Sequence, residues 1–339
     1  MRISVQKISL ALCGLLAITT LMGCSKSGKN SSSASSSTQG AATPRLRIAV
    51  IPKGHTDVYW KYVHAGAAAA GRKLHVKILF QGPSQDGDRA AEISLMRNFV
   101  TQGVSGIVLA PVDSRALVPS VKLADAAHIP VVIIDSALKA TPGKDFVSFV
   151  ATDNFKAGEI AGKALAKQLD GKGNVVFLRF IVGSASTDAR AAGCMAVLKK
   201  YPGIKIIANQ RGGGTAGKCK AVALSMADSL RHADGIFAAN ETTTFGMYLA
   251  LQQLGLLGQK KFVGFDWQSN FKKPIEKGEI NGVVVQDPYN MAYLGVTYLV
   301  NDIRGTTPPL KFDTPAMLVT PANIHTPKIE KLINLPPIQ

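Results

Sequence analysis

Residues 129–135 read Ile-Pro-Val-Val-Ile-Ile-Asp, an apolar run that ends abruptly in an aspartate. Residues 107–113 (Ile-Val-Leu-Ala-Pro-Val-Asp) and 262–266 (Phe-Val-Gly-Phe-Asp) follow the same plan. Because apolar residues fill these short runs without alternating with polar ones, both faces of each strand must be covered, as in a parallel sheet between two layers of helices. Runs of this kind predict an α/β protein.

The same rhythm continues along the chain from residue 46. Segments with helical periodicity separate the apolar runs, for example at 57–72, 88–102, 154–169, 215–230 and 290–303. The expected strands form two series of five, at 46–51, 75–80, 106–109, 130–134 and 146–150, and then at 174–178, 205–208, 235–238, 261–264 and 282–285. Two such series, in a chain too long for one core, predict two doubly wound parallel-sheet lobes.

The N-terminus predicts export. Arg2 and Lys7 precede an almost unbroken apolar run over residues 8–22, which is too short for a comfortable membrane span and is typical of a signal peptide. The run ends at Leu21-Met22-Gly23-Cys24, which resembles the lipobox of bacterial lipoproteins. We therefore expect residues 1–23 to be a lipoprotein signal peptide and Cys24 to carry the lipid. An ordinary signal peptide with an incidental cysteine is the alternative.

The segment that follows Cys24 favours the lipoprotein interpretation. Residues 24–44 are rich in Ser, Gly, Lys and Ala and contain no large apolar residue, so they predict a flexible tether. An anchored receptor needs such a tether. The mature protein is then expected in the periplasm or at the cell surface, held to the membrane through its lipid, as a monomer.

The formal net charge is +17, and a basic excess can indicate a nucleic-acid partner. Lys and Arg are nevertheless scattered singly along the chain, and the predicted export separates the protein from nucleic acid. We expect a basic, solvated surface that can lie against anionic lipid. Cys194 and Cys219 leave two alternatives open, a disulfide in an oxidising compartment or two buried thiols.

Polar and aromatic side chains follow nearly every expected strand, at the edge where ligands bind in open α/β sheets. In chain order these residues are His55, Asp57, Tyr59, Trp60, Asp135, Ser136, Asp153, Ser186, Asp188, Arg190, Asn240, Glu241, Asp266, Trp267 and Gln286. Carboxylates, amides and a guanidinium pair well with sugar hydroxyls, and aromatic rings cover the apolar faces of a sugar. Single residues such as Asp57 or Asp153 also stand where a helix N-cap belongs.

The chain from about Leu46 to Pro327 resembles the periplasmic sugar-binding proteins of the ribose-binding type, which serve ABC importers and share their fold with the effector domains of LacI-type repressors. The stretches that carry the resemblance are 107–113, 129–135, 150–154 (Val-Ala-Thr-Asp-Asn), 237–241 (Phe-Ala-Ala-Asn-Glu), 262–266 and 283–290 (Val-Val-Val-Gln-Asp-Pro-Tyr-Asn). The resemblance implies the type I periplasmic binding protein fold with a hinge of three segments. Residues 45–150 with about 287–315 would form the N-terminal lobe, and residues 151–286 with about 316–330 the C-terminal lobe.

The resemblance also assigns the ligand contacts. It implies roles for Asp57, Tyr59, Trp60, Asp135, Arg190, Asn240, Asp266 and Gln286. The positions of His55, Ser136 and Asp153 after expected strands make them further candidates. Two departures make ribose itself doubtful. Ser136 stands where the ribose-type pattern has an arginine, and the phenylalanine expected near 212–215 is missing. Trp267 is our candidate for the opposite stacking face.

These observations predict a lipoprotein that captures a sugar or related polyol between its lobes and delivers it to an ABC permease. Presentation of the ligand to a chemotaxis or sensor-kinase pathway is the alternative. An enzyme is disfavoured, although Gly212 to Lys218 has the spacing of a phosphate loop, because Cys219 occupies the position of its Ser or Thr. The histidines show no metal spacing, so we expect no metal and no cofactor. The predicted signal peptide and the lack of a DNA-binding headpiece argue against a repressor.

Overall fold

The computed structural model describes residues 45–55 and 57–334 of the 339-residue chain. The predicted signal peptide, the lipidation candidate Cys24 and the whole of the predicted tether lie outside these residues. Within the described part of the chain, no helix is both long enough and apolar enough to cross a membrane.

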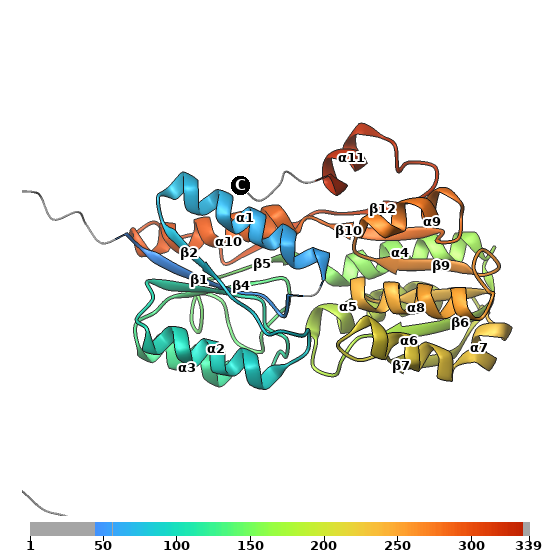
Figure 1. The fold of residues 1–339 in the computed structure, drawn as a ribbon, viewed down its shortest axis with the longest axis horizontal. Helices are drawn as coiled ribbons and strands as arrows, with labels where there is room; N and C mark the ends of the chain where they lie inside the picture. The colour runs from blue at the N-terminus through green and yellow to red at the C-terminus, as the bar shows by residue number, and fades with distance from the viewer. Residues whose placement is uncertain (1–44, 56, 335–339) are drawn as a thin grey trace, which may run out of the picture. The chain divides into compact units, whose positions relative to one another are not determined.

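The first sheet has six parallel strands in the order β11-β5-β4-β3-β1-β2. They are β1 (Arg47–Ile51), β2 (Lys77–Phe80), β3 (Gly106–Leu109), β4 (Val131–Ile134), β5 (Ser148–Thr152) and β11 (Lys311–Thr314). Helices α1 (Val58–Leu74) and α10 (Pro288–Ile303) pack on one face, and α2 (Arg89–Thr101) and α3 (Val118–Ala126) on the other (Figure 1). The central strands β3 and β4 are buried throughout, as their continuous apolar runs predict.

The second sheet also has six strands, in the order β12-β10-β9-β8-β6-β7, and only β12 is antiparallel to its neighbour. They are β6 (Lys172–Arg179), β7 (Gly203–Arg211), β8 (Gly235–Ala238), β9 (Lys261–Phe265), β10 (Gly282–Gln286) and β12 (Ala316–Val319). Helices α4 (Asn154–Gln168) and α5 (Ala185–Leu198) cover one face. The other face carries α6 (Ala216–Ser225), α7 (Ala227–His232), α8 (Glu241–Gln253), η1 (Ser269–Phe271), α9 (Lys272–Glu276) and α11 (Pro327–Ile333).

The described chain passes between the two sheets three times. It leaves the first sheet after β5, returns with α10, which packs on α1 and on β3 to β5, and leaves again between β11 and β12. Each sheet is thus wound from helical crossovers, with the first lobe built around one sheet and the second lobe around the other. The predicted fold class, two doubly wound parallel-sheet lobes joined by a hinge of several segments, is confirmed.

Two expected elements have different bounds in the structure, and one strand was missed. The helix expected at 215–230 is divided into α6 and α7 at Met226, and the strand expected at 205–208 extends over all of β7. Strand β11 was missed, because Lys311, Phe312 and Asp313 are exposed and give this edge strand no apolar run. Its place in the sheet comes from pairing with β5 alone.

Cys194 and Cys219 are buried free thiols, which decides between the two alternatives left open by the sequence. Cys194 on α5 packs into the cluster on one face of the second sheet, and Cys219 on α6 packs into the cluster on the other face. The sheet separates the two sulfur atoms, so the pair cannot approach to disulfide distance without rebuilding the lobe.

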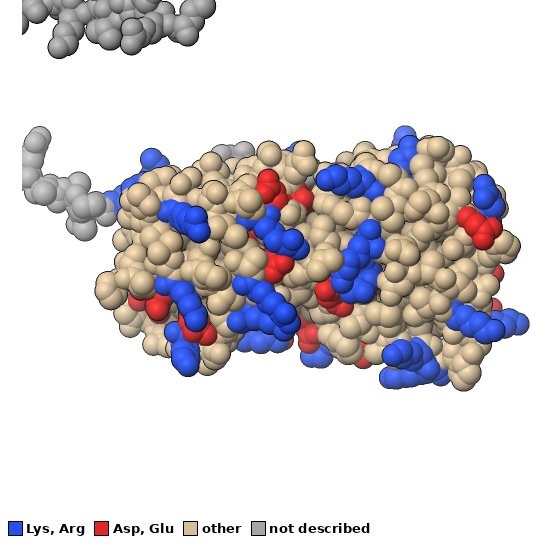
Figure 2. Space-filling model, turned by 90° about the horizontal axis from the view of Figure 1, so that it is seen from below, with Lys and Arg blue, Asp and Glu red and all other residues tan. Residues whose placement is uncertain are grey.

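The charged surface agrees with the scattered basic residues of the sequence. Figure 2 shows one face of the molecule, on which Lys and Arg are dispersed with Asp and Glu between them rather than gathered in one stripe. A dispersed arrangement of this kind differs from the continuous basic patch of a nucleic-acid interface.

Candidate ligand-binding site

A polar cavity lies between the two lobes, at the carboxyl ends of their strands. The first lobe contributes Lys53, Asp57, Tyr59, Trp60, Asp86 and Asp135, and the second contributes Phe180, Ser186, Thr187, Arg190, Asn240 and Asp266. Its open space is about 20 Å³, little more than a water molecule needs. The cavity is this small because its own polar side chains bond to one another.

Asp135 is the centre of the first-lobe half. It follows β4 with a positive φ of 63°, in the left-handed region, which turns the chain sharply at the strand end. Lys53 Nζ lies 2.6 Å from its Oδ2, and the Tyr59 hydroxyl donates to its Oδ1 at 2.9 Å. Lys53 was not a sequence candidate, because a single lysine after a strand usually lies in solvent. Here packing buries it.

Trp60 and Asp86 form the neighbouring wall. The indole Nε1 of Trp60 donates to Asp86 Oδ2 at 2.9 Å, and its ring lies perpendicular to that of Tyr59, with 4.9 Å between the centroids. Asp86 was also missed, because it stands in a loop of Gly, Ser and Asp residues that reads as solvent-exposed. The indole bond and the closure of the two lobes bury its carboxyl group.

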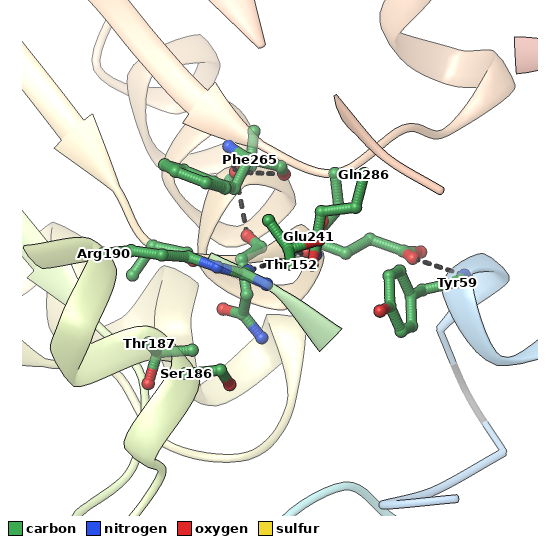
Figure 3. Close-up of polar contacts among 12 residues, drawn as sticks. Tyr59, Thr152, Ser186, Thr187, Arg190, Glu241, Phe265 and Gln286 are labelled. Atoms are coloured by element: carbon green, nitrogen blue, oxygen red, sulfur yellow. Dashed lines mark hydrogen bonds and ion pairs between the residues drawn. The ribbon is translucent and has the colours of Figure 1, made fainter. Parts of the chain in front are cut away.

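Arg190 organises the second-lobe half from helix α5 (Figure 3). Its Nε donates to Asn154 Oδ1 at 2.7 Å, and its Nη1 donates to the Ala239 carbonyl at 3.1 Å and to Asp266 Oδ2 at 3.3 Å. The guanidinium lies over the Phe265 ring, 4.8 Å from its centroid. Only 2% of Arg190 is exposed, so the arginine is fixed before any ligand arrives.

Asp266 completes this half from the end of β9. Like Asp135, it has a positive φ, of 66°, and it also accepts from Gln286 Nε2 at 2.6 Å. Burial raises the pKa of Asp266, and the neighbouring Arg190 and Gln286 oppose this rise. Both strand-end aspartates therefore present carboxylates that the protein itself holds in place.

Two helix N-termini meet between the lobes, and the first-lobe helix α1 is capped by a residue of the second lobe. Asp57 precedes α1 but does not cap it, and its Oδ2 instead accepts from Thr242 Oγ1 of α8 at 2.6 Å. Glu241 at the start of α8 accepts the backbone N–H groups of Val58 and Tyr59, both at 2.8 Å (Figure 3). Each lobe thus supplies an acceptor to the helix end of the other, which ties the lobes together in a closed arrangement.

A second set of contacts closes the other side of the cavity. Lys53 Nζ donates to Ser186 Oγ at 3.2 Å, and the Ser186 backbone N–H donates to Ser136 Oγ at 3.1 Å. The loop after β7 comes so close that a Cβ on Gly214 would lie 2.0 Å from the carbonyl oxygen of Asp86. Only glycine permits this approach without a shift of the backbone.

Burial raises the pKa values of three acidic residues at the cavity, Asp57, Asp86 and Glu241. It raises the pKa of Asp86 to about 6 and holds that of Asp57 well above its ordinary value, where the neighbouring Asp86 adds to the rise. The pKa of Glu241 is likewise raised, first by burial and then by Asp57. A proton or a cation between these groups would remove the repulsion.

The remaining sequence candidates lie in several places. Asn240 lines the cavity and also caps α8, since its Oδ1 accepts from the Thr243 N–H at 3.2 Å. Gln286 and Trp267 line a smaller neighbouring cavity together with Tyr59 and Asp266, and Trp267 packs into the second-lobe core. Phe180, which directly follows β6 and was missed, is the second-lobe aromatic residue of the main cavity.

The three further candidates are not equivalent. Ser136 is buried beside the cavity and bonds to Ser186. Asp153 caps α4 by accepting the Lys156 N–H at 3.1 Å, as its position before a helix allows. His55 is exposed, and its Nε2 accepts the Gly82 N–H at 3.0 Å. Neither His55 nor Asp153 lines the main cavity.

The fold and the cavity define a class of protein, a two-lobed α/β binding protein with a buried polar site between its lobes. The chain belongs to the periplasmic binding protein domain family, whose match covers residues 48–307. The predicted resemblance is thereby confirmed, and the family is a component of transport systems rather than a family of enzymes.

Several known proteins are similar to this chain over most of its length. The chain is 30% identical over 293 residues to the D-ribose/D-allose-binding protein of Pseudomonas aeruginosa, covering 83% of this chain and 91% of that protein. It is 33% identical to a carbohydrate transporter solute binding protein from Agrobacterium radiobacter in complex with D-arabinose, with a TM-score of 0.81 and coverage of 86% and 100%. An ABC transporter solute binding protein from Agrobacterium vitis bound with alpha-D-tagatopyranose is 27% identical, with a TM-score of 0.82 and the same coverage.

Proposed function

We propose that this protein captures a sugar or related polyol between its two lobes and delivers it to an ABC-type importer. The cavity lining is the observation that carries the proposal. It places carboxylates, an amide, hydroxyls, Lys53 and Arg190 around one small space, and it adds Tyr59 and Trp60 from one lobe and Phe180 from the other. Hydroxyl groups donate and accept at once, so a polyol can satisfy a lining of this mixed character.

Binding requires the lobes to part and close again. The closed cavity admits little more than a water molecule, so a ligand of sugar size enters only when the bonds of Asp57 and Glu241 to the opposite lobe are broken. On closure these bonds form again, and the ligand adds its own contacts to both lobes. The ligand thereby shifts the population toward the closed form, which is the form presented to the permease.

The moving bodies in this proposal are the two predicted lobes, residues 45–150 with about 287–315 and residues 151–286 with about 316–330. Their support is the membership of each strand in one of the two sheets, although β5 stays in the first sheet up to Thr152, two residues past the predicted boundary. Because several crossing segments of the chain form the hinge between the lobes, closure is expected to be a rotation about that hinge, with each sheet kept intact.

The lipid anchor and the monomeric state belong to the proposal as well. A lipid on Cys24 with a tether up to residue 44 would keep the receptor near its permease while leaving it free to turn. The related proteins named above give the signalling alternative no support, since their names describe binding and transport.

A thermal-shift screen against pentoses, hexoses and polyols tests the binding proposal. A ligand at about 100 times its Kd adds about 2.7 kcal/mol to the free energy of unfolding, and so raises Tm measurably. The hit should lose its effect in Asp135→Asn, which removes the charge that Lys53 binds, and keep it in Asp228→Asn on the exposed surface of α7. If no carbohydrate or polyol, amino derivatives included, shifts Tm, the sugar proposal is wrong.

The anchor is tested separately in a bacterial host. Cys24→Ser should move the protein from the membrane fraction to the soluble fraction and abolish incorporation of a labelled fatty acid. A wild-type chain that carries no fatty acid would contradict the lipoprotein proposal and leave the binding proposal untouched.

A further inference from the structure

The cavity has more negative than positive groups. Four aspartates line it, but only two cations do. Lys53 pairs with Asp135 at 2.6 Å, and Arg190 pairs with Asp266 at 3.3 Å. Asp57 and Asp86 remain, and neither forms an ion pair with any described residue. The site thus carries an excess of two carboxyl groups, both from the first lobe.

Asp86 has an unused acceptor atom in this position. Its Oδ2 accepts from the Trp60 indole, whereas its Oδ1 is buried and receives no N–H or O–H from the described protein. The residue is 5% exposed. A buried carboxylate oxygen without a donor is costly, so the arrangement is complete only when something else donates to it.

Asp57 is the immediate neighbour of this oxygen. The two carboxyl groups lie within hydrogen-bonding range of each other. Asp86 raises the pKa of Asp57, whereas the hydrogen bond from Asp57 lowers the pKa of Asp86, so Asp57 is the member that holds a shared proton. Asp57 has one fixed donor, Thr242 Oγ1. Such a pair is stable with one shared proton or with a cation between its members.

Lys53 does not supply that cation. Its ammonium group is held by Asp135 and Ser186, and it acts on Asp86 through charge alone, without a hydrogen bond. The second-lobe cation, Arg190, pairs with Asp266 and also donates to Asn154 and to the Ala239 carbonyl, so its charge is directed at Asp266 rather than at Asp57 or Asp86. No cation of the described residues is therefore free to pair with Asp57 and Asp86, and a cation that replaces their shared proton would be supplied by a ligand.

We propose that the ligand presents a protonated amine to Asp57 and Asp86, and is therefore an amino sugar or an amino polyol. This inference rests on the proposed function and narrows its ligand class. The ammonium group donates to Asp86 Oδ1 and to Asp57, replacing the shared proton, while the hydroxyls of the same ligand meet Asp135, Asn240 and Arg190. The aromatic rings of Trp60 and Tyr59 lie beside the proposed position of the amine and further favour the binding of a cationic ligand.

Matched ligand pairs test the proposal by isothermal titration calorimetry near neutral pH. Each pair is a 2-amino-2-deoxy sugar or 1-amino-1-deoxyalditol and its parent sugar or alditol, with the N-acetylated compound as the control that keeps the size and loses the charge. The best amine should bind about tenfold more tightly than its parent, which is the gain of a charge-assisted over a neutral hydrogen bond. N-acetylation should abolish this preference.

Proton release gives an independent readout. At about pH 6, where Asp86 is half protonated, an amine that replaces the shared proton releases protons to the buffer, and a neutral sugar does not. Titrations in two buffers of different ionisation enthalpy measure the number released. The groups that face the pair and affect this number are Lys53, Glu241, Asp135, Asp266, Cys219, Trp60 and Thr242.

Variants locate the effect. Asp86→Asn should reduce the ratio of amine to parent affinity to about one, because only the ionic gain is lost. Asp228→Asn, with a side chain that is 90% exposed, should leave the ratio unchanged. If Asp86→Asn does not fold, Asp57→Asn serves in its place.

The outcomes separate the two levels of the proposal. Equal or tighter binding of the parent sugars, with no proton release, overturns the amine proposal and leaves sugar capture standing. Binding of neither amines nor parents overturns both. A preference for the amine that survives in Asp86→Asn and Asp57→Asn also overturns the proposed site.

Discussion

Replacement of Arg190 by methionine tests the part of the site that the protein completes before ligand binds. The substitution keeps much of the volume and removes three hydrogen bonds, to Asn154 Oδ1, the Ala239 carbonyl and Asp266 Oδ2. Removal of one partner from a buried ion pair costs about 3 to 5 kcal/mol. Here the Asp266 carboxylate keeps two donors, Gln286 Nε2 and the Glu241 N–H. We therefore expect Arg190→Met to lower the free energy of unfolding by about 3 kcal/mol, the lower end of this range.

The assay is chemical denaturation of wild type, Arg190→Met, Asp266→Asn and the double variant. If the unpaired carboxylate causes the loss, the double variant is more stable than the sum of the single effects predicts, by about 1 to 3 kcal/mol. Lys311→Met serves as a control, because its pair with Asp313 is largely exposed and should contribute less than about 1 kcal/mol.

The pH dependence supplies the sign. Burial already raises the pKa of Asp266, and loss of Arg190 raises it further. In folded Arg190→Met, Asp266 then binds a proton more tightly than it does in the unfolded chain. Its contribution to the free energy of unfolding is therefore greatest at low pH and is lost as the pH rises through the folded-state pKa. This account of Arg190 would be refuted if the losses in free energy of unfolding of the two single variants simply add in the double variant. It would also be refuted if the loss in Arg190→Met were the same at acidic and neutral pH.

Three further predictions concern other parts of the molecule. Glu241→Ala leaves the first two N–H groups of α1 without their acceptor in the closed form, so ligand affinity measured by calorimetry should fall about tenfold, and an unchanged Kd would show that this bond does not contribute to closure. Because the pKa of Asp86 is raised to about 6, the ligand-free protein should lose stability as the pH rises from about 4 to about 6, and Asp86→Asn should flatten the profile. Cys194 and Cys219 are buried, and burial raises the pKa of Cys219 to about 12, so both thiols should resist alkylation in the native protein and react only in denaturant, as peptide mass spectrometry would show. Rapid native labelling of either would contradict the described packing.

Sequence patterns predicted the architecture because burial on both faces leaves a local signature. Residues 131–134 are apolar without alternation, and they form the fully buried strand β4. The aspartates that follow β4 and β9 were found for the same reason, since a polar residue at the end of an apolar strand marks the binding edge of the sheet. Strand β11, with three exposed residues, left no such signature.

The composition of the cavity depended on contacts between distant segments. Lys53 and Asp86 read as solvent residues in the sequence, and they became buried only because the second lobe closes over them. Conversely, Asp153 has the position of a ligand residue and is a helix cap, and a cap and a ligand contact call for the same side chain at the same place.

The sequence by itself determined the two parallel sheets, the set of strand-end polar residues and the predicted export signal, because hydrophobic periodicity and strand ends are local properties. Tertiary structure alone decided which carboxylates have partners. Asp135 and Asp266 each meet a cation that stands more than fifty residues away in the chain, and Asp57 and Asp86 meet only each other and neutral donors. Charge balance in a buried site is a property of the packed lobes, and no run of residues encodes it.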